Sequence, residues 1–288
     1  MRQATKTITP KMATAWLSKN TNNRSLSARR VEQYARDMSQ GKWKMTHQGI
    51  AFDGNGTLVD GQHRLAAVIQ SGKPIKMLVS EGVEGDANEF IDRGRARSFA
   101  DTLKMRDVKY TTQVSAACRM ILIMDRGIMQ PSDAERDSIF KSRPFGASLT
   151  WLSEEVCTGM HGGDPRKAAA YYGPLTWVHR YFSTECEAFD ASVRTGDGLR
   201  AKSPELLLRD YLMRQHAAPR SMRAHSWDTA GKVMTCLALS ISGKTISKLH
   251  PGAIGYKDLC KLVGRKARPQ AIAVLSVKGT SSKAKGNK

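Results

Sequence analysis

The chain has 288 residues, of which 40% are hydrophobic, a length and composition that suit a globular protein with two modest cores. No apolar run approaches the roughly 18 residues of a membrane span, and the first residues, MRQATKTITP, lack the apolar stretch of a signal peptide, so we expect a cytoplasmic protein without a membrane partner. The 46 Lys and Arg against 26 Asp and Glu give a net charge of +20, which favours nucleic-acid or nucleotide partners over a basic protein with no such partner.

Two helices are predicted in the first 41 residues. Thr9 can cap a helix whose first position is Pro10, and this short helix should end near Asn20. Ser27 can cap a second helix. Its apolar residues recur at helical spacing and stop before a glycine: Val31, Tyr34, Ala35, Met38 and then Gly41.

A hairpin, a helix and a strand are predicted next. Two short β-type runs in GIAFDGNGTLVD flank the turn-forming residues 53–56, which favours a hairpin. Apolar residues at helical spacing predict a helix over residues 62–71, and IKMLVSEGV reads as a buried strand. These elements indicate a small α+β domain over residues 1–108.

The rest of the chain has helical signals throughout. They occur in residues 110–127, 131–142, 147–157, 164–182, 203–215 and 226–241, separated by Gly, Pro and Asp clusters. We therefore expect an all-helical domain over residues 109–275, in which five scattered cysteines serve as small core residues. Residues 264–288 contain seven Lys or Arg and no acid, which predicts a disordered basic tail at 276–288.

The start of the third predicted helix carries the most concentrated chemistry. In VDGQHRLAA, residues 59–67, an acid, a glycine, a histidine and an arginine stand before an apolar run. A helix start exposes backbone N–H groups and the positive end of the helix dipole, so phosphate binds well there. Gly61 would let the backbone approach an anion, Arg64 would supply a two-pronged hydrogen bond, and His63 would exchange a proton near neutral pH. Asp60 would hold a Mg²⁺ ion that bridges phosphates.

Each of these residues also has a structural interpretation. Gly61 suits a strand-to-helix turn, and His63 suits packing against the hairpin. Asp60 can be a helix cap, worth about 1 kcal/mol. Arg64 can form a surface ion pair.

VDGQHRLAA resembles the box of the ParB N-terminal domain and sulfiredoxin superfamily, which holds nucleotide phosphates with a Gly and an Arg on a helix start. NTNNR, residues 20–24, resembles the segment before the helix in ParB proteins, and residues 48–50 fall where those proteins have Gln-Pro-Ile. DRGRARS, residues 92–98, occupies the place of a second phosphate-contacting segment. Residues 8–104 most resemble ParB-like proteins of phages, plasmids and other mobile elements, and a weaker similarity covers much of the helical half.

The resemblance implies a ParB/sulfiredoxin-like domain followed by helices, with a bound nucleoside triphosphate, CTP or ATP, and Mg²⁺. It also implies that DNA is a partner and that the protein lies at the nucleoid of a bacterial or phage-infected cell. A homodimer is compatible with this resemblance. The nucleotide site would comprise Arg24, Gly61, Gln62, His63, Arg64 and Arg97. The candidate catalytic residues are Asp60, His63 and Asp92, and the candidate DNA contacts are Arg93, Arg95, Lys266 and Arg268.

The sequence departs from the family in three respects. Sulfiredoxins carry a nucleophilic cysteine in this box, but here Gln62 and His63 stand there, so repair of cysteine sulfinic acid is not expected. ParB partition proteins usually have Gly-Glu-Arg-Arg at this point, so the choice of nucleotide stays open. The sequence after residue 108 contains no helix-turn-helix of the partition type, so binding to a specific centromere-like DNA site is not expected.

Three functions remain open from the sequence. The first is a nucleotide-binding, DNA-associated protein of a phage or mobile element, in which NTP hydrolysis switches the grip on DNA. The second is catalysis on the same fold, by an ATP-dependent phosphotransferase acting on modified DNA or by a nuclease. The third is a basic DNA-binding adaptor with a vestigial pocket.

Overall fold

The computed structural model describes residues 1–20, 23, 25–84, 98–159, 164, 166, 168–222, 224–249 and 254–275. The chain divides into two compact units. Unit 1 comprises Met1–Arg97 and Ser132–Glu135, and unit 2 comprises Ser98–Pro131 and Arg136–Lys288. The domain boundaries expected at residues 108 and 275 stay predictions. Within the described ranges, every helix is too short or too polar to span a membrane.

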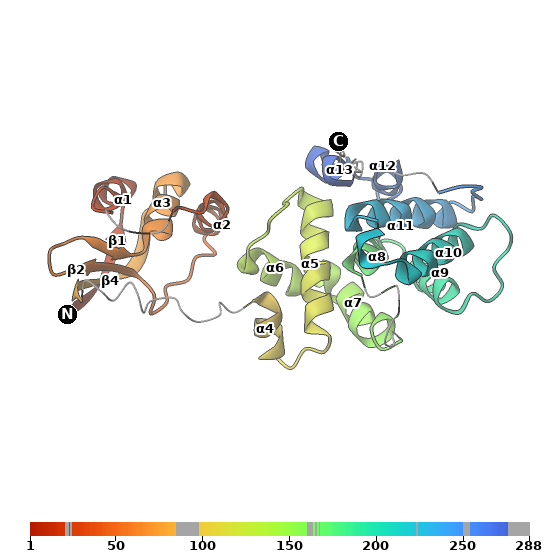
Figure 1. The fold of residues 1–288 in the computed structure, drawn as a ribbon, viewed down its shortest axis with the longest axis horizontal. Helices are drawn as coiled ribbons and strands as arrows, with labels where there is room; N and C mark the ends of the chain where they lie inside the picture. Colours follow the sequence, from red (N-terminus) through yellow and green to blue (C-terminus); the bar gives the residue numbers. More distant parts are fainter. Residues whose placement is uncertain are drawn as a thin grey trace, which may run out of the picture. The chain divides into compact units, whose positions relative to one another are not determined.

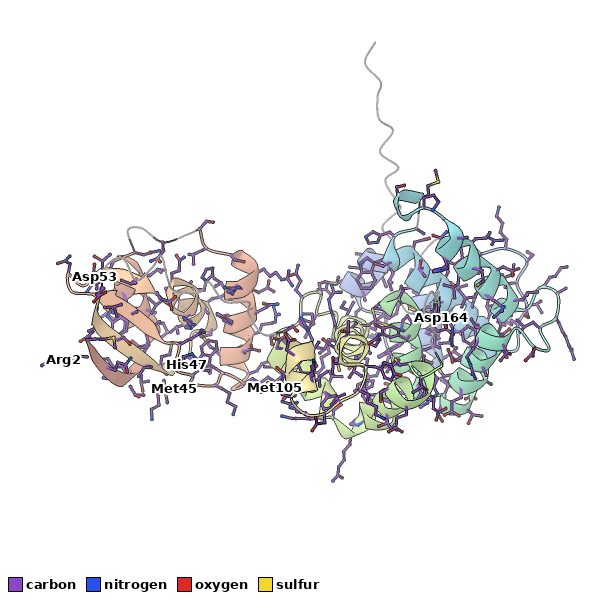
Figure 2. The ribbon with its side chains drawn as sticks, turned by 60° about the horizontal axis from the view of Figure 1, so that its bottom comes forward. Arg2, Met45, His47, Asp53, Met105 and Asp164 are labelled. Carbon is purple, nitrogen blue, oxygen red and sulfur yellow. The ribbon has the colours of Figure 1, made fainter. Side chains whose placement is uncertain are left out.

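Unit 1 is built on a mixed four-stranded sheet in the order β1-β4-β2-β3. Its strands are β1 (Arg2–Ile8), β2 (Ile50–Asp53), β3 (Leu58–Asp60) and β4 (Ile75–Val83). β4 pairs antiparallel with β1 and parallel with β2, and β2 pairs antiparallel with β3. The β2–β3 pair is the predicted hairpin. Asp53, labelled in Figure 2, stabilises its turn because Oδ1 accepts hydrogen bonds from the N–H groups of Asn55 and Thr57 at 2.9 and 2.7 Å.

Three helices lie on the same side of this sheet (Figure 1): α1 (Pro10–Leu17), α2 (Ala28–Ser39) and α3 (Gln62–Ser71). All three were predicted, and the capping hydroxyls of Thr9 and Ser27 accept hydrogen bonds from the third helical N–H group. The core between helices and sheet is formed by alternate residues of the strands and the apolar stripes of the helices. Its members include Ile75, Met77 and Val79 of β4, Val31, Ala35 and Met38 of α2, and Leu65 and Val68 of α3.

Strand β1 was not predicted. Its sequence RQATKTI has no alternating apolar pattern, because the first six residues are polar or alanine and only Ile8 is buried. β1 is an edge strand, held by pairing with β4 from Arg2–Glu81 to Ile8–Ile75 and by an ion pair of 2.8 Å between Lys6 Nζ and Glu81 Oε1. Main-chain pairing, which leaves no hydrophobic pattern in the sequence, therefore defines this strand.

Unit 2 is helical in all of its described elements. These are α4 (Phe99–Lys104), α5 (Thr111–Arg126), α6 (Asp133–Phe140, whose first turn counts with unit 1), α7 (Arg143–Trp151), the π-helix η2 (Leu152–Val156), α8 (Ala169–His179), α9 (Ser183–Thr195), α10 (Pro204–Ala217), the short 3₁₀ turn η4 (Arg220–Met222), α11 (Ser226–Ile241), α12 (Ile254–Leu262) and α13 (Pro269–Leu275). The protein is thus an α+β sheet unit followed by a largely helical region.

Helix α8 is the centre of the unit 2 core. Ten of its residues, Ala170–His179, are buried, and it packs against α5, α9 and α11. All five cysteines are buried free thiols, as expected for small core residues. Burial raises the pKa of each thiol, for example to about 12 for Cys118, so none is poised as a nucleophile.

The predicted helices of unit 2 were found, but four others were missed: α4, α9, α12 and α13. Helix α9 shows why. Its buried residues Cys186, Phe189, Asp190 and Val193 have helical spacing, but one of them is an aspartate. A buried acid removes one member from the apolar pattern, so the stripe cannot be recognised until a partner for that acid is known.

Candidate phosphate-binding site

The starts of α2 and α3 lie next to each other in unit 1. The two helices pack together, and the Ser27 N–H donates a hydrogen bond to His63 Nε2 at 2.9 Å. Ser27 also caps α2, because its Oγ accepts from the Arg30 N–H at 3.4 Å. Neither helix has an acid in its first turn. Two helix starts, each with the positive end of a helix dipole, therefore meet at one place, and such ends attract anions.

Gly61 makes the turn from β3 into α3. Its φ of +103° and ψ of 6° are left-handed, and a Cβ there would lie 2.5 Å from Ile50 Cδ1 and 3.1 Å from the Gly49 carbonyl oxygen. Both the backbone conformation and the space require glycine. The N–H of Gly61 donates to Asp60 Oδ1 at 2.6 Å, so Asp60 contacts the start of α3 with its carboxylate.

Arg64 projects from the first turn of α3 toward the loop before β2. One terminal nitrogen, Nη1, donates to the Gly49 carbonyl oxygen at 3.1 Å and to Asp60 Oδ2 at 3.3 Å, and Nη2 donates to Gln48 Oε1 at 3.2 Å. The side chain is only 14% exposed. A guanidinium has five N–H groups, so these three bonds leave further donors for a ligand. Arg64 thus combines the predicted ion pair with residual hydrogen-bonding capacity.

Gln62 and His63 are buried and bind neighbouring loops. Gln62 Oε1 accepts from Asn20 Nδ2 at 2.9 Å, beyond the end of α1. His63 Nε2 accepts the Ser27 N–H, so in the neutral ring the proton is on Nδ1. With Nε2 engaged in this bond, His63 sets the relative position of the two helix starts, which favours its structural interpretation over proton transfer.

Arg29 and Arg30 are functional candidates that the sequence reasoning missed. Both are exposed in the first turn of α2, and among the described residues their side chains have no hydrogen bond or ion pair. Cations at a helix N-terminus are electrostatically unfavourable unless an anion is near. The sequence did contain a signal for them: two arginines come shortly after the Ser27 cap, in a helical turn where acids are usual.

The predicted site residues do not all lie at the starts of α2 and α3. Arg24, Asp92, Arg93, Arg95 and Arg97 lie outside the described residues. Lys266 and Arg268 belong to unit 2, in the loop between α12 and α13. Asp60, the candidate metal ligand, contacts Gly61 and Arg64, and the described part of the chain contains no group of three or more acids, histidines or cysteines that would hold a metal ion.

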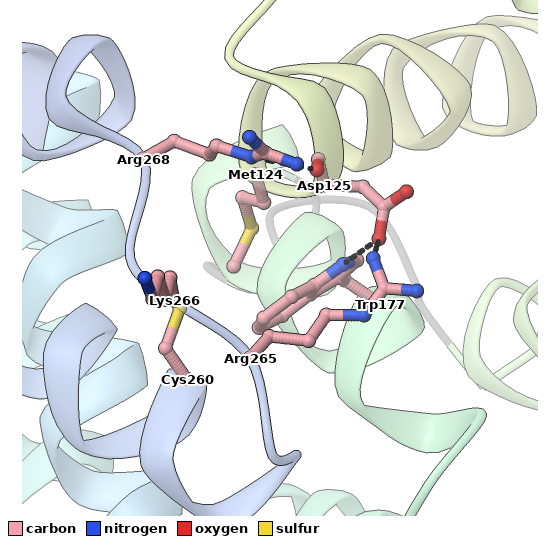
Figure 3. Close-up of a pocket in the computed structure, with 7 residues that line it drawn as sticks. All are labelled: Met124, Asp125, Trp177, Cys260, Arg265, Lys266 and Arg268. Atoms are coloured by element: carbon pink, nitrogen blue, oxygen red, sulfur yellow. Dashed lines mark hydrogen bonds and ion pairs between the residues drawn. The ribbon is translucent and has the colours of Figure 1, made fainter.

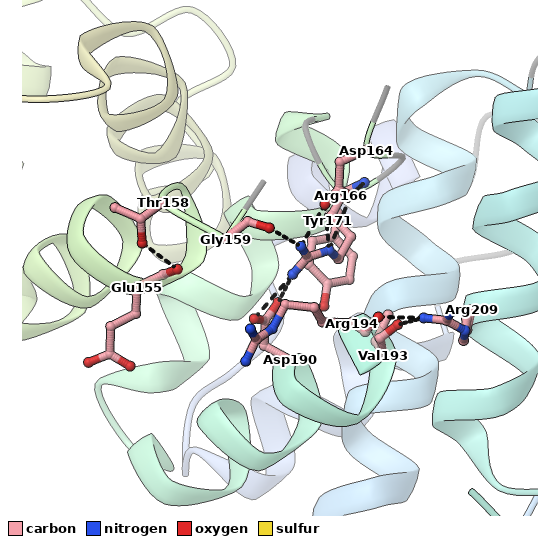
Figure 4. A network of polar contacts seen from close by, with 10 residues as sticks. All are labelled: Glu155, Thr158, Gly159, Asp164, Arg166, Tyr171, Asp190, Val193, Arg194 and Arg209. Carbon is pink, nitrogen blue, oxygen red and sulfur yellow. Dashed lines mark hydrogen bonds and ion pairs between the residues drawn. The ribbon is translucent and has the colours of Figure 1, made fainter. Parts of the chain in front are cut away.

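A buried ionic network occupies unit 2 (Figure 4). Arg166 is 3% exposed and contacts both Asp164, with Nη2 to Oδ2 at 2.6 Å, and Asp190, with Nη1 to Oδ1 at 3.3 Å. The Tyr171 hydroxyl donates to Asp190 Oδ1 at 2.8 Å. Burial raises the pKa of Asp190, and the Arg166 charge opposes that rise. The network joins the segment before α8 to α9 and has the features of a structural clamp.

A serine, a histidine and a glutamate also line up in unit 2. His179 Nδ1 lies 3.2 Å from Ser148 Oγ, and its Nε2 lies 3.3 Å from Glu187 Oε1. The order matches a nucleophile, base and acid. Ser148 is only 1% exposed and the Trp151 ring stacks on His179 at 4.3 Å, so the hydroxyl is shielded from any substrate. We assign this group to core stability.

His179 is expected to make unit 2 less stable at mildly acidic pH. Burial lowers the pKa of His179 below its ordinary value of 6.5, although its hydrogen bond with Glu187 opposes the shift. The unfolded chain therefore binds a proton first, so stability present above pH 6.5 is lost as the pH falls below that value. Between about pH 7.5 and about pH 5.5 the loss from this group is at most about 1.4 kcal/mol. Urea unfolding of the wild type and of His179→Gln measures it, and equal pH dependence in the two proteins would contradict the assignment.

Comparisons with known proteins give no family for this chain: no family model, no curated protein and no solved structure matches it.

Proposed function

We propose that unit 1 is a ParB/sulfiredoxin-like nucleotide-binding domain and that the protein is a DNA-associated, nucleotide-binding protein of a phage or other mobile element. The observation that carries the proposal is the meeting of two helix starts through the Ser27–His63 hydrogen bond, with the exposed cations Arg29 and Arg30 beside it. The resemblance of residues 59–67 to the family's phosphate box gives independent support.

The ligand in this proposal is the triphosphate of CTP or ATP. Exposed guanidinium groups of Arg29 and Arg30 would bind phosphate oxygens, and Arg64 would add its remaining N–H groups. Asp60 would repel a bare phosphate, because its carboxylate already lies at the start of α3. A Mg²⁺ ion shared between Asp60 and phosphate oxygens would neutralise that repulsion.

Binding is better supported than catalysis at this site. A phosphotransferase or nuclease needs a base that reaches the attacking oxygen. The two described candidates are both engaged, His63 with the Ser27 N–H and Asp60 with Gly61 and Arg64. We therefore propose that any hydrolysis serves to change the protein's state, and that tight nucleotide binding is the primary property.

The test is calorimetric titration of the full chain with CTP and with ATP, each in the presence of Mg²⁺. The double variant Arg29→Ala/Arg30→Ala should lose roughly tenfold or more in affinity, because a hydrogen bond to a charged group contributes about 1.5–3 kcal/mol. These side chains have no partners in the described fold, so folding should be unaffected.

A matched control removes the same charge elsewhere in unit 1. Lys73→Ala/Lys76→Ala changes two exposed cations beyond the C-terminal end of α3 and should bind nucleotide like the wild type. Absence of nucleotide binding by the wild type would end the proposal. An equal loss of nucleotide affinity in the two double variants would show that the effect comes from net charge in general and not from a specific site.

A further inference from the structure

A cavity of about 420 Å³ lies in unit 2, lined by the end of α5, by α8 and α12, and by the loop that joins α12 to α13 (Figure 3). Trp177 and Cys260 form its interior wall. Three cations of the loop, Arg265, Lys266 and Arg268, stand around it against one acid, Asp125. Three basic side chains within four consecutive residues therefore face one hollow with a net positive charge.

Asp125 holds two of these cations in place without using up their donors. Arg265 forms an ion pair with its carboxylate, and Trp177 Nε1 donates to the same Oδ1 at 3.4 Å. Arg268 Nε donates to the Asp125 carbonyl oxygen at 3.3 Å, which leaves its terminal nitrogens available. The Tyr256 hydroxyl accepts from the Arg268 N–H at 3.4 Å and so fixes the loop backbone.

Lys266 differs from the other two cations of the loop because no polar contact within the described fold engages its side chain. It is exposed, and it forms no hydrogen bond or ion pair with any described residue. The chain after α13 continues with lysines at positions 278, 283, 285 and 288 and with no acid. The cavity therefore lies next to a basic C-terminal sequence along the chain, and its lining carries three cations against one acid.

We propose that this loop is a phosphate-binding contact for the DNA backbone. The proposal rests on the DNA association proposed above and gives it a place in unit 2. The oxygens of a phosphodiester match the free N–H groups of Arg265 and Arg268 and the ammonium of Lys266. Trp177 is fully buried, so its ring cannot stack on a base, and the contact reads charge and not sequence.

The experiment is fluorescence anisotropy of a labelled DNA duplex with the full-length protein over a series of salt concentrations. Lys266→Ala should lower the slope of log affinity against log salt by about 0.9, because one phosphate contact is lost. Lys266→Glu should weaken binding further. The control Lys257→Ala removes an exposed lysine of α12 that does not line the cavity, and its slope should equal that of the wild type.

The outcomes separate this contact from the nucleotide site. The proposal is supported if the slope of log affinity against log salt is smaller in Lys266→Ala but not in Lys257→Ala, while the CTP and ATP titrations stay unchanged. Equal slopes in the wild type and Lys266→Ala, or equal losses in Lys266→Ala and Lys257→Ala, overturn it. A wild type that binds nucleotide but no DNA also overturns it while leaving the nucleotide site intact, whereas a wild type that binds neither removes the proposed function as well.

Discussion

Replacement of Arg166 by methionine is expected to destabilise unit 2 by about 3–5 kcal/mol, because it leaves a buried carboxylate without its cation. Asp190 is 6% exposed, and its two oxygens each lie 3.3 Å from Arg166 Nη1. After the substitution only the Tyr171 hydroxyl and more distant charges would oppose the cost of burying Asp190. Asp164 and the Gly159 carbonyl oxygen, which Arg166 contacts at 2.6 and 3.1 Å, would also lose a donor.

Urea unfolding followed by tryptophan fluorescence measures this loss. Arg200→Met removes an exposed arginine of the same unit and should change the stability by less than about 0.5 kcal/mol. Arg166→Met/Asp190→Asn should recover part of the loss, since the uncompensated charge is gone. A single variant within about 1 kcal/mol of the wild type would show that the network does not clamp the unit.

Substitution of alanine for Gly49 should cost unit 1 several kcal/mol and disturb the candidate site together with the sheet. A Cβ at this position would lie 1.9 Å from the Leu78 carbonyl oxygen and 2.6 Å from its carbonyl carbon, both backbone atoms of β4. Because a backbone cannot rotate away as a side chain does, β2 must separate from β4. The Gly49 carbonyl oxygen would move with it, away from Arg64 Nη1.

Gly54→Ala is the matched control, because a Cβ there meets no atom within 4 Å. Thermal unfolding should show a large drop in midpoint for Gly49→Ala and little change for Gly54→Ala. Similar midpoints for Gly49→Ala and the wild type would mean that the strands are not packed as closely as described.

The sequence predicted those parts of the fold that depend on local chemistry. The capping hydroxyls of Thr9 and Ser27, the turn at residues 53–56 and the left-handed Gly61 each act within a few residues of their own position. Local helical signals were sufficient for α5, α8 and α11, whose buried residues are mostly apolar. Strand β1 and helix α9 could not be predicted in this way. β1 depends on pairing with β4, and α9 depends on a partner for buried Asp190, and both are contacts between residues far apart in the chain.

The candidate site divides along the same line. The chemistry of residues 60–64 was visible in the sequence, but their partners were not. That Arg64 reaches Gln48 and Gly49, and that His63 accepts from Ser27, depends on how α3 meets β2 and α2. The same meeting of helices gives Arg29 and Arg30 their importance, since a pair of arginines after a cap has no evident role until a second helix start lies beside it.

Hydrogen exchange of the backbone amides, measured by mass spectrometry on the full chain with and without CTP or ATP and Mg²⁺, tests the central claim most directly. Nucleotide bound at the paired helix starts should slow exchange in the peptides that cover residues 27–31 and 61–65, with no comparable change in unit 2. Unchanged exchange in both segments at saturating nucleotide, or protection confined to other parts of the chain, would contradict the account.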